Sequence, residues 1–215
     1  QHAARNVVRT EKNGKITVLA DKYDGKRFNS PNDVAVRSDG TLWFTDPPWG
    51  LRGEREVSGN WVYSLDPKTG KVQVVVKDLA MPNGIIFSPD ESRIYIADTG
   101  GHPRHSPPDL RNTPDRVHCY AVSKKGKLGK KLFHIDGGSD GMAVDVKGNL
   151  YTTHRGSVHI FNADGKRLGE IECPEGPANC TFGGKDFKTL FITARKSLYR
   201  IRLRNAGAKP PGATW

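Results

Sequence analysis

One short motif occurs in four copies along the chain and limits what the chain can fold into. In its best-preserved copy, residues 30–46, Pro31-Asn32 opens a short apolar run, and Asp39-Gly40 separates that run from a second one. The copies are headed by Asn32, Asn83, Asp140 and Asn179, at intervals of 51, 57 and 39 residues. Repeats of this length, each holding short strand patterns, are typical of β-propeller blades.

The rest of the pattern also favours short strands. No stretch carries apolar residues at the 3.6-residue period of a helix, and turn pairs such as Asn13-Gly14 separate the apolar runs. A β-sandwich uses short strands too, but it does not need the same step at the head of every fourth strand. We therefore predict an all-β fold, a β-propeller of the six-bladed type, of which this chain carries about four to four and a half blades.

These blades set the expected domain organisation. Residues 1–205 are expected to form a single partial β-propeller domain, and residues 206–215, which are rich in Pro and Gly, a disordered tail. Six blades need about 300 residues. Since the chain has 215, about a blade and a half is expected to be absent from it.

The net charge of +11 raises the question of an anionic partner. Most of the basic residues lie beside turn glycines, as in residues 12–15, 68–71 and 124–127, and no nucleic-acid motif accompanies them. We predict solvated loops and no nucleic-acid partner, while acidic small molecules stay open. No apolar run is long enough to span a bilayer. The compartment cannot be read from a chain that opens on Gln1, and Cys119, Cys173 and Cys180 show no paired spacing that would indicate a disulfide framework.

The residues at the heads of the repeats share oxygen-bearing side chains. In a propeller such positions converge on one axis, where Asn and Asp oxygens would suit a hard cation such as Ca²⁺ better than zinc. The same residues also form turns through hydrogen bonds from side chain to backbone. Repetition alone leaves both interpretations open.

The motifs together resemble a known family. They are Asn29–Val34 with Leu42–Pro47, then Met81-Pro82-Asn83-Gly84, Asp140-Gly141-Met142, and Asn179–Gly184 with Leu190–Thr193. This set is similar to the gluconolactonase branch of the senescence marker protein, gluconolactonase and luciferin-regenerating enzyme family. The resemblance implies a six-bladed propeller that carries one divalent cation and hydrolyses a small-molecule sugar lactone, such as glucono-1,5-lactone. Ca²⁺ is the first choice, with Zn²⁺, Mn²⁺ and Mg²⁺ as alternatives.

The resemblance also implies roles for individual residues. Asn83 and Asp140 correspond to metal ligands, Asn32 lies near both metal and substrate, and Asp140 is the favoured general base. The family's N-terminal Glu-Gly-Pro motif, which supplies a further ligand, has no counterpart early in this chain. The Glu175-Gly176-Pro177 sequence lies in a connector and is interpreted as coincidence. This departure puts the activity of these residues alone in question.

Two other functions stay open beside the lactonase. One is a non-catalytic propeller that acts as a binding module, and the other is a related ester or organophosphate hydrolase on the same scaffold. The expected oligomeric state is a monomer or weak oligomer. Roles for His2, Trp49, Asp98 and His154 are not assigned, and the His102–His105 loop is interpreted as solvated in preference to a channel cap or a transition-metal site.

Overall fold

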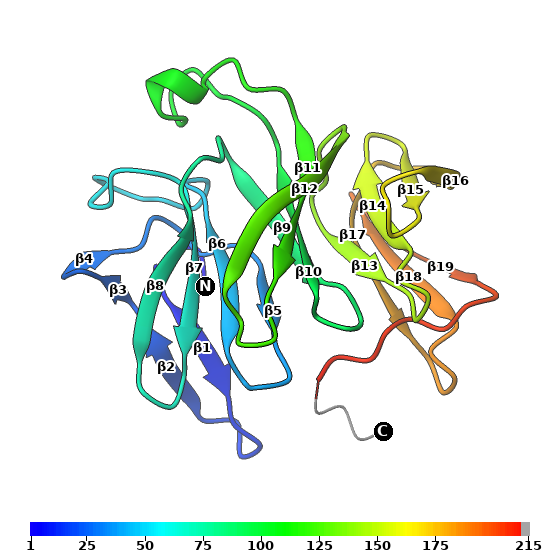
Figure 1. Ribbon diagram of the computed structural model, residues 1–215, viewed down its shortest axis with the longest axis horizontal. Coiled ribbons are helices and arrows are strands. Elements are labelled where there is room, and N and C mark those ends of the chain that lie inside the picture. Colours follow the sequence, from blue (N-terminus) through cyan, green and yellow to red (C-terminus); the bar gives the residue numbers. More distant parts are fainter. Residues whose placement is uncertain (212–215) are drawn as a thin grey trace. The chain divides into compact units, whose positions relative to one another are not determined.

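The computed structural model describes residues 1–211 and is built almost entirely of β-strands (Figure 1). Four antiparallel sheets follow one another along the chain, and each pairs its strands in sequence order. The sheets consist of β5 (Val34–Val36), β6 (Leu42–Asp46), β7 (Trp61–Asp66) and β8 (Lys71–Val76); β9 (Pro82–Phe87), β10 (Arg93–Asp98), β11 (Arg116–Val122) and β12 (Leu128–Asp136); β13 (Met142–Val144), β14 (Leu150–His154), β15 (Ser157–Phe161) and β16 (Arg167–Glu172); and β17 (Pro177–Gly183), β18 (Thr189–Ala194) and β19 (Leu198–Arg202).

Two hairpins precede these sheets. They are β1 (Val7–Thr10) with β2 (Ile16–Ala20), and β3 (Lys22–Tyr23) with β4 (Lys26–Arg27). The long β10–β11 connection contains a short 3₁₀ helix, η1 (Pro108–Leu110). No helix within residues 1–211 is long and apolar enough to cross a membrane. The sheets confirm the prediction of an all-β fold built from blades of short strands.

The chain forms two compact units. Residues 1–83 and 100–113 make up the first, and residues 84–99 with the chain from Pro114 onward make up the second. This division does not test the prediction of one domain over residues 1–205, which stays a prediction.

Aromatic side chains form the core of the first unit. Phe28, Phe44 and Tyr63 are buried, with ring centroids 5.1 to 5.3 Å apart. Phe44 and Tyr63 lie opposite each other on β6 and β7, so one sheet face supplies most of this cluster. Such a cluster contributes both buried apolar area and favourable ring geometry.

The second unit has two apolar cores. The first cluster includes Tyr95, Cys119 and Leu150, and the second includes Tyr151, Cys180 and Leu190. Leu150 and Tyr151 are neighbours on β14, and because successive side chains of a strand point to opposite faces, the third sheet contributes to both cores.

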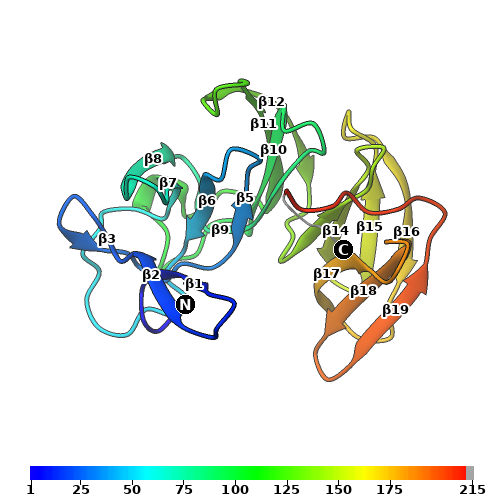
Figure 2. The ribbon, with the colours of Figure 1, turned by 90° about the horizontal axis from the view of Figure 1, so that it is seen from below.

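The expected disordered tail begins too early. Residues 206–208 are ordered: the Val146 amide donates to the carbonyl oxygen of Ala206 at 2.9 Å, and the Ala208 amide donates to the carbonyl of Val144 at 2.9 Å. Figure 2 shows this segment running back from β19 across the third sheet. The prediction is therefore wrong for residues 206–208, and residues 212–215 lie outside the described part of the chain.

Candidate functional site

In the first unit, one threonine holds two of the predicted site residues. The Asn32 amide donates to the carbonyl oxygen of Thr45 at 2.9 Å, and the Thr45 hydroxyl donates to the carbonyl oxygen of Asn83 at 2.7 Å. Thr45 is fully buried. The backbones of Asn32 and Asn83 are thus fixed on either side of one strand residue.

The side chain of Asn83 has an unsatisfied acceptor. Asn83 is 6% exposed, and within the described residues its Oδ1 atom is buried and accepts no hydrogen bond. Burying an amide oxygen without a partner costs about 1–3 kcal/mol. This oxygen suits a hard cation, since amide oxygens are accepted Ca²⁺ ligands, so the residue fits the role that the sequence resemblance implied.

In the second unit, Gly84 lies against Asp140, and Gly141 lies against Asn179. A Cβ atom on Gly84 would lie 2.1 Å from the carbonyl oxygen of Asp140, and one on Gly141 would lie 2.0 Å from the Asn179 side chain. The Gly141 amide also donates to the carbonyl of Ala178 at 2.7 Å. Gly84 and Gly141 are therefore required by close approach, and the Asp140 side chain is exposed at this edge.

The register of the fourth sheet corrects one sequence prediction. Met142 is paired with Thr152, so the preceding residue, Gly141, lies opposite Thr153. Asn179 lies opposite the corresponding threonine of the fourth sheet, Thr193, and therefore matches Gly141. Ala178, and not Asn179, therefore occupies the position of Asp140. The Asn179 side chain accepts a hydrogen bond from the next amide at 2.8 Å, as Asp33 does in the first sheet. The predicted equivalence of Asn179 with Asn32, Asn83 and Asp140 is wrong by one residue.

A buried carboxylate supports the first repeat head. Both oxygens of Asp46 accept backbone hydrogen bonds, from Asn29 at 2.8 Å and Ser30 at 2.7 Å. Burial raises the pKa of Asp46 from 3.8 to about 7, and the two amides with Arg5 and Arg55 only partly oppose this. Asp46 thus fixes the segment that leads to Asn32.

This raised pKa predicts a pH-dependent stability. Because the folded-state pKa of Asp46 is above the unfolded value, the native state binds more protons between about pH 4 and pH 7. The free energy of unfolding should then fall by roughly 2–4 kcal/mol as the pH rises over this range. Urea unfolding at pH 5 and pH 8 measures the fall. The Asp46→Asn variant is less stable but should show a smaller fall, and equal falls in both proteins would contradict the prediction.

His154 has a similar supporting role at the third head. Its Nδ1 atom is 2.9 Å from the carbonyl oxygen of Gly138, two residues before Asp140. Gly137 has a φ of 91°, and the ring of His154 lies against it. Asp98 is fully buried at the end of β10. His154 therefore shapes the turn that carries Asp140.

The loop after β6 presents an aromatic side chain. Trp49 is 41% exposed, and the next amide, that of Gly50, donates to the Ser30 hydroxyl at 2.8 Å. His2 packs so closely against Gly50 that a Cβ there would lie 2.5 Å from it. The loop that carries Trp49 is thereby held against the segment that leads to Asn32.

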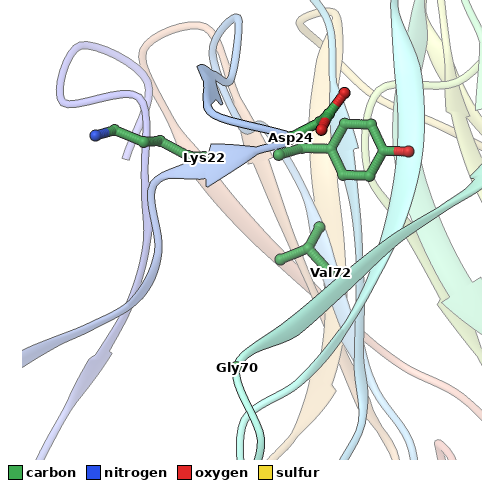
Figure 3. Close-up of a pocket in the computed structure, with 5 residues that line it drawn as sticks. Lys22, Asp24, Gly70 and Val72 are labelled. Carbon is green, nitrogen blue, oxygen red and sulfur yellow. The ribbon is translucent and has the colours of Figure 1, made fainter.

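An open pocket of about 460 Å³ lies elsewhere in the first unit. Lys22, Tyr23, Asp24, Gly70 and Val72 line it, and none of them is a predicted site residue. Figure 3 shows Lys22 pointing away from Asp24 and Val72, so polar groups do not converge there. This pocket does not offer a catalytic arrangement.

Comparison with known proteins identifies the family of the chain. The family model for the SMP-30/gluconolactonase/LRE-like region matches residues 2–196. The chain belongs to this family. A gluconolactonase of Zymomonas mobilis is 34% identical over 89% of the chain, and a diisopropyl-fluorophosphatase of Loligo vulgaris is 30% identical over 89% of it. The aligned parts make up 55% and 62% of those relatives, so the chain spans little more than half their length.

A solved gluconolactonase from Xanthomonas campestris gives the structural match within the family. Its TM-score is 0.81, at 34% identity, over 94% of this chain and 67% of that one. This match confirms the β-propeller class, here with four blade sheets among the described residues. The number of blades in the whole protein stays a prediction.

The next question is which residues of the described chain could bind the predicted cation. Within residues 1–211, no three His, Cys, Asp or Glu side chains gather into a metal-binding group. Glu175, in the Glu-Gly-Pro sequence, instead accepts hydrogen bonds from Lys196 and Ser197 in the β18–β19 turn. Asn32, Asn83 and Asp140, with two amide oxygens and one carboxylate, stay the predicted ligands.

Sequence reasoning missed the threonines that fix the heads. Thr153 donates to the carbonyls of Gly141 and Ala178, and Thr193 donates to the carbonyl of Asn179, as Thr45 does to that of Asn83. The signal was present, because a threonine stands at the same place in three of the four repeats.

Proposed function

We propose that this protein hydrolyses a sugar lactone with the help of a divalent cation. The proposal is supported by family membership, by the lactonase relative, and above all by the buried and unsatisfied Oδ1 atom of Asn83. Because the chain spans little more than half the length of those relatives, the activity of the whole protein is part of the proposal.

The proposed ligands are Asn83, Asp140 and Asn32. The cation, with Ca²⁺ as first choice, would polarise the lactone carbonyl and lower the pKa of a water molecule. Thr45 holds the backbones of Asn32 and Asn83, and the turn shaped by His154 holds Asp140.

Asp140 is proposed as the general base. Its exposed carboxylate accepts a proton from water as the water oxygen bonds to the lactone carbonyl carbon. The ring C–O bond then breaks, Asp140 returns the proton to the ring oxygen, and the product is an open-chain hydroxy acid. The Asn32 amide, half-buried at the first head, hydrogen-bonds the substrate.

An organophosphate hydrolase is the second candidate. It is supported by the 30% identity to a relative named for diisopropyl fluorophosphate. The same polarising cation would act on a P=O bond in place of a C=O bond. Measuring the hydrolysis of a sugar lactone and of diisopropyl fluorophosphate with one preparation distinguishes the two candidate functions.

Removing and restoring the cation tests the proposal. Protein treated with a chelator should hydrolyse glucono-1,5-lactone slowly, and added Ca²⁺, Zn²⁺ or Mn²⁺ should restore acid release. In Asn83→Ala this response should be lost, because the buried amide oxygen is removed, whereas the exposed turn variant Asn13→Ala should keep it.

Thermal unfolding gives a readout that needs no activity. A cation at 100 times its Kd stabilises the native state by about 2.7 kcal/mol, so the Tm of the native protein should rise with the cation and that of Asn83→Ala should not. An equal rise in both proteins would remove Asn83 from its assigned role.

A further inference from the structure

The loop of residues 100–113 is fixed by hydrogen bonds within the first unit. The carbonyl oxygen of His105 accepts bonds from Arg55 and Asn60, both at 3.0 Å. The Ser106 hydroxyl donates to the carbonyl of Ala80 at 3.3 Å, and buried Asn60 donates to the same carbonyl at 2.6 Å. The loop is therefore a fixed support, and the His102 and His105 side chains on it are exposed, as the sequence indicated.

Basic side chains gather on this support. The rings of His102 and His105 are stacked, with centroids 4.6 Å apart and planes 28° apart. Burial first, and then the charges of His102, Arg55 and Arg104, lower the pKa of His105. Arg55 hydrogen-bonds the His105 carbonyl, and the backbone amide of Arg104 donates to His102 Nδ1 at 3.2 Å. His105, His102, Arg104 and Arg55 are here called the basic loop cluster.

The charges of the basic loop cluster are not matched by acidic side chains in the described part of the chain. Within residues 1–211, neither Arg55 nor Arg104 forms an ion pair. The acid that acts on Arg55 is Asp46, whose two oxygens already accept backbone hydrogen bonds. Glu54, beside Arg55, and Asp109, on the same loop, are exposed and form no ion pair with any described residue. The positive charge of the cluster is therefore left for a ligand.

The position of the cluster links it to the proposed site. The carbonyl that anchors the loop belongs to Ala80, three residues before Asn83, and the backbone between them leads directly into β9. Arg55 lies on the same β6–β7 connection as Trp49. The Ala80 carbonyl thus ties the loop that carries the cluster to the backbone that leads to Asn83.

We propose that the basic loop cluster binds an oxyanion group, such as a phosphate, sulfonate or carboxylate, carried by the lactone substrate. Guanidinium and imidazole N–H groups are suited to such oxygens, because charge-assisted hydrogen bonds are stronger than neutral ones. This inference rests on the proposed function and narrows it to anionic sugar lactones. Arg104 and His105 supply the specificity, while Arg55 also holds the loop.

Inorganic phosphate provides a test that does not depend on hydrolysis. Titration of the full-length protein should shift the NMR signals of His102 and His105, and calorimetry should give a Kd. Arg104→Ala should weaken phosphate binding about tenfold, as should His105→Gln, since each removes a charge-assisted bond. Arg111→Ala, an exposed arginine of the same loop, is the matched control and should bind as the native protein does. Equal binding by native protein and Arg104→Ala would overturn the proposal.

A second arm tests whether the oxyanion belongs to the substrate. The kcat/KM for 6-phosphoglucono-lactone should exceed that for glucono-1,5-lactone at least tenfold, and Arg104→Ala should remove this preference mainly through KM. A native protein that binds phosphate but prefers the neutral lactone would overturn the substrate assignment. Phosphate binding that is weakened by Arg104→Ala, in a protein without lactonase activity, would support the oxyanion site while the proposed function failed.

Discussion

Replacing Gly84 by alanine should destabilise the protein by about 2–3 kcal/mol and lower the proposed lactonase activity about a hundredfold. The added Cβ would lie 2.1 Å from the carbonyl oxygen of Asp140 and 3.2 Å from its carbonyl carbon. These are backbone atoms of a neighbouring sheet head, so they cannot rotate aside as a side chain can. The expected result is displacement of Asp140, the proposed general base.

Two other glycines provide controls for this change. A Cβ atom added to Gly169, in β16, would meet nothing within 4 Å, and Gly169 has no left-handed φ, so Gly169→Ala should leave stability and activity nearly unchanged. At Gly141 the obstacle is the Asn179 side chain. Gly141→Ala should therefore be partly rescued by Asn179→Gly, whereas no side-chain change should rescue Gly84→Ala. Denaturant unfolding and initial rates measure both, and a Gly84→Ala protein that resembled Gly169→Ala would contradict the packing argument.

The sequence was sufficient to predict the strands because local chemistry sets them. The Asn13-Gly14 and Asp39-Gly40 turns were predicted from residue type, and Gly14 and Gly40 indeed have φ values of 82° and 88°. The repeated heads gave the blade spacing. Both signals depend on residues close together in sequence, which a single chain displays.

The pairing register of the strands could not be predicted in the same way. A slip of one residue moves every side chain of a strand to the opposite face, and the pairing shift between Pro177 and Asn179 is a bulge that no turn residue announces. Asn179 therefore looked like a fourth head when Ala178 occupies that position. For Asn32, Asn83 and Asp140 the alignment came from family motifs in addition to repetition, and their ligand roles stay proposals.

The prediction of disorder for the C-terminal segment failed for a different reason. The segment's Gly and Pro content indicated disorder, but the carbonyl oxygen of Ala206 accepts a hydrogen bond from the amide of Val146, a residue far away in sequence. Val146 belongs to a turn that buried Asp145 holds by accepting bonds from the Lys147 and Asn149 amides. A contact over this distance is invisible to a prediction based on local composition.

Asp140→Asn should reduce kcat by about 10²- to 10⁴-fold while leaving the fold intact. Asparagine has nearly the same shape as aspartate but cannot take a proton from water, and the exposed position of Asp140 means that the change leaves no buried cavity. Initial rates of glucono-1,5-lactone hydrolysis, corrected for the spontaneous reaction, measure the loss. The Tm should stay within a few degrees of the native value.

A matched variant makes this test specific. Asp21, an exposed aspartate in the first unit, loses the same charge in Asp21→Asn, and this variant should keep the native rate. Cation binding measured on Asp140→Asn then separates its two proposed roles: retained binding with lost turnover assigns the residue to proton transfer, whereas unchanged turnover would remove Asp140 from the mechanism.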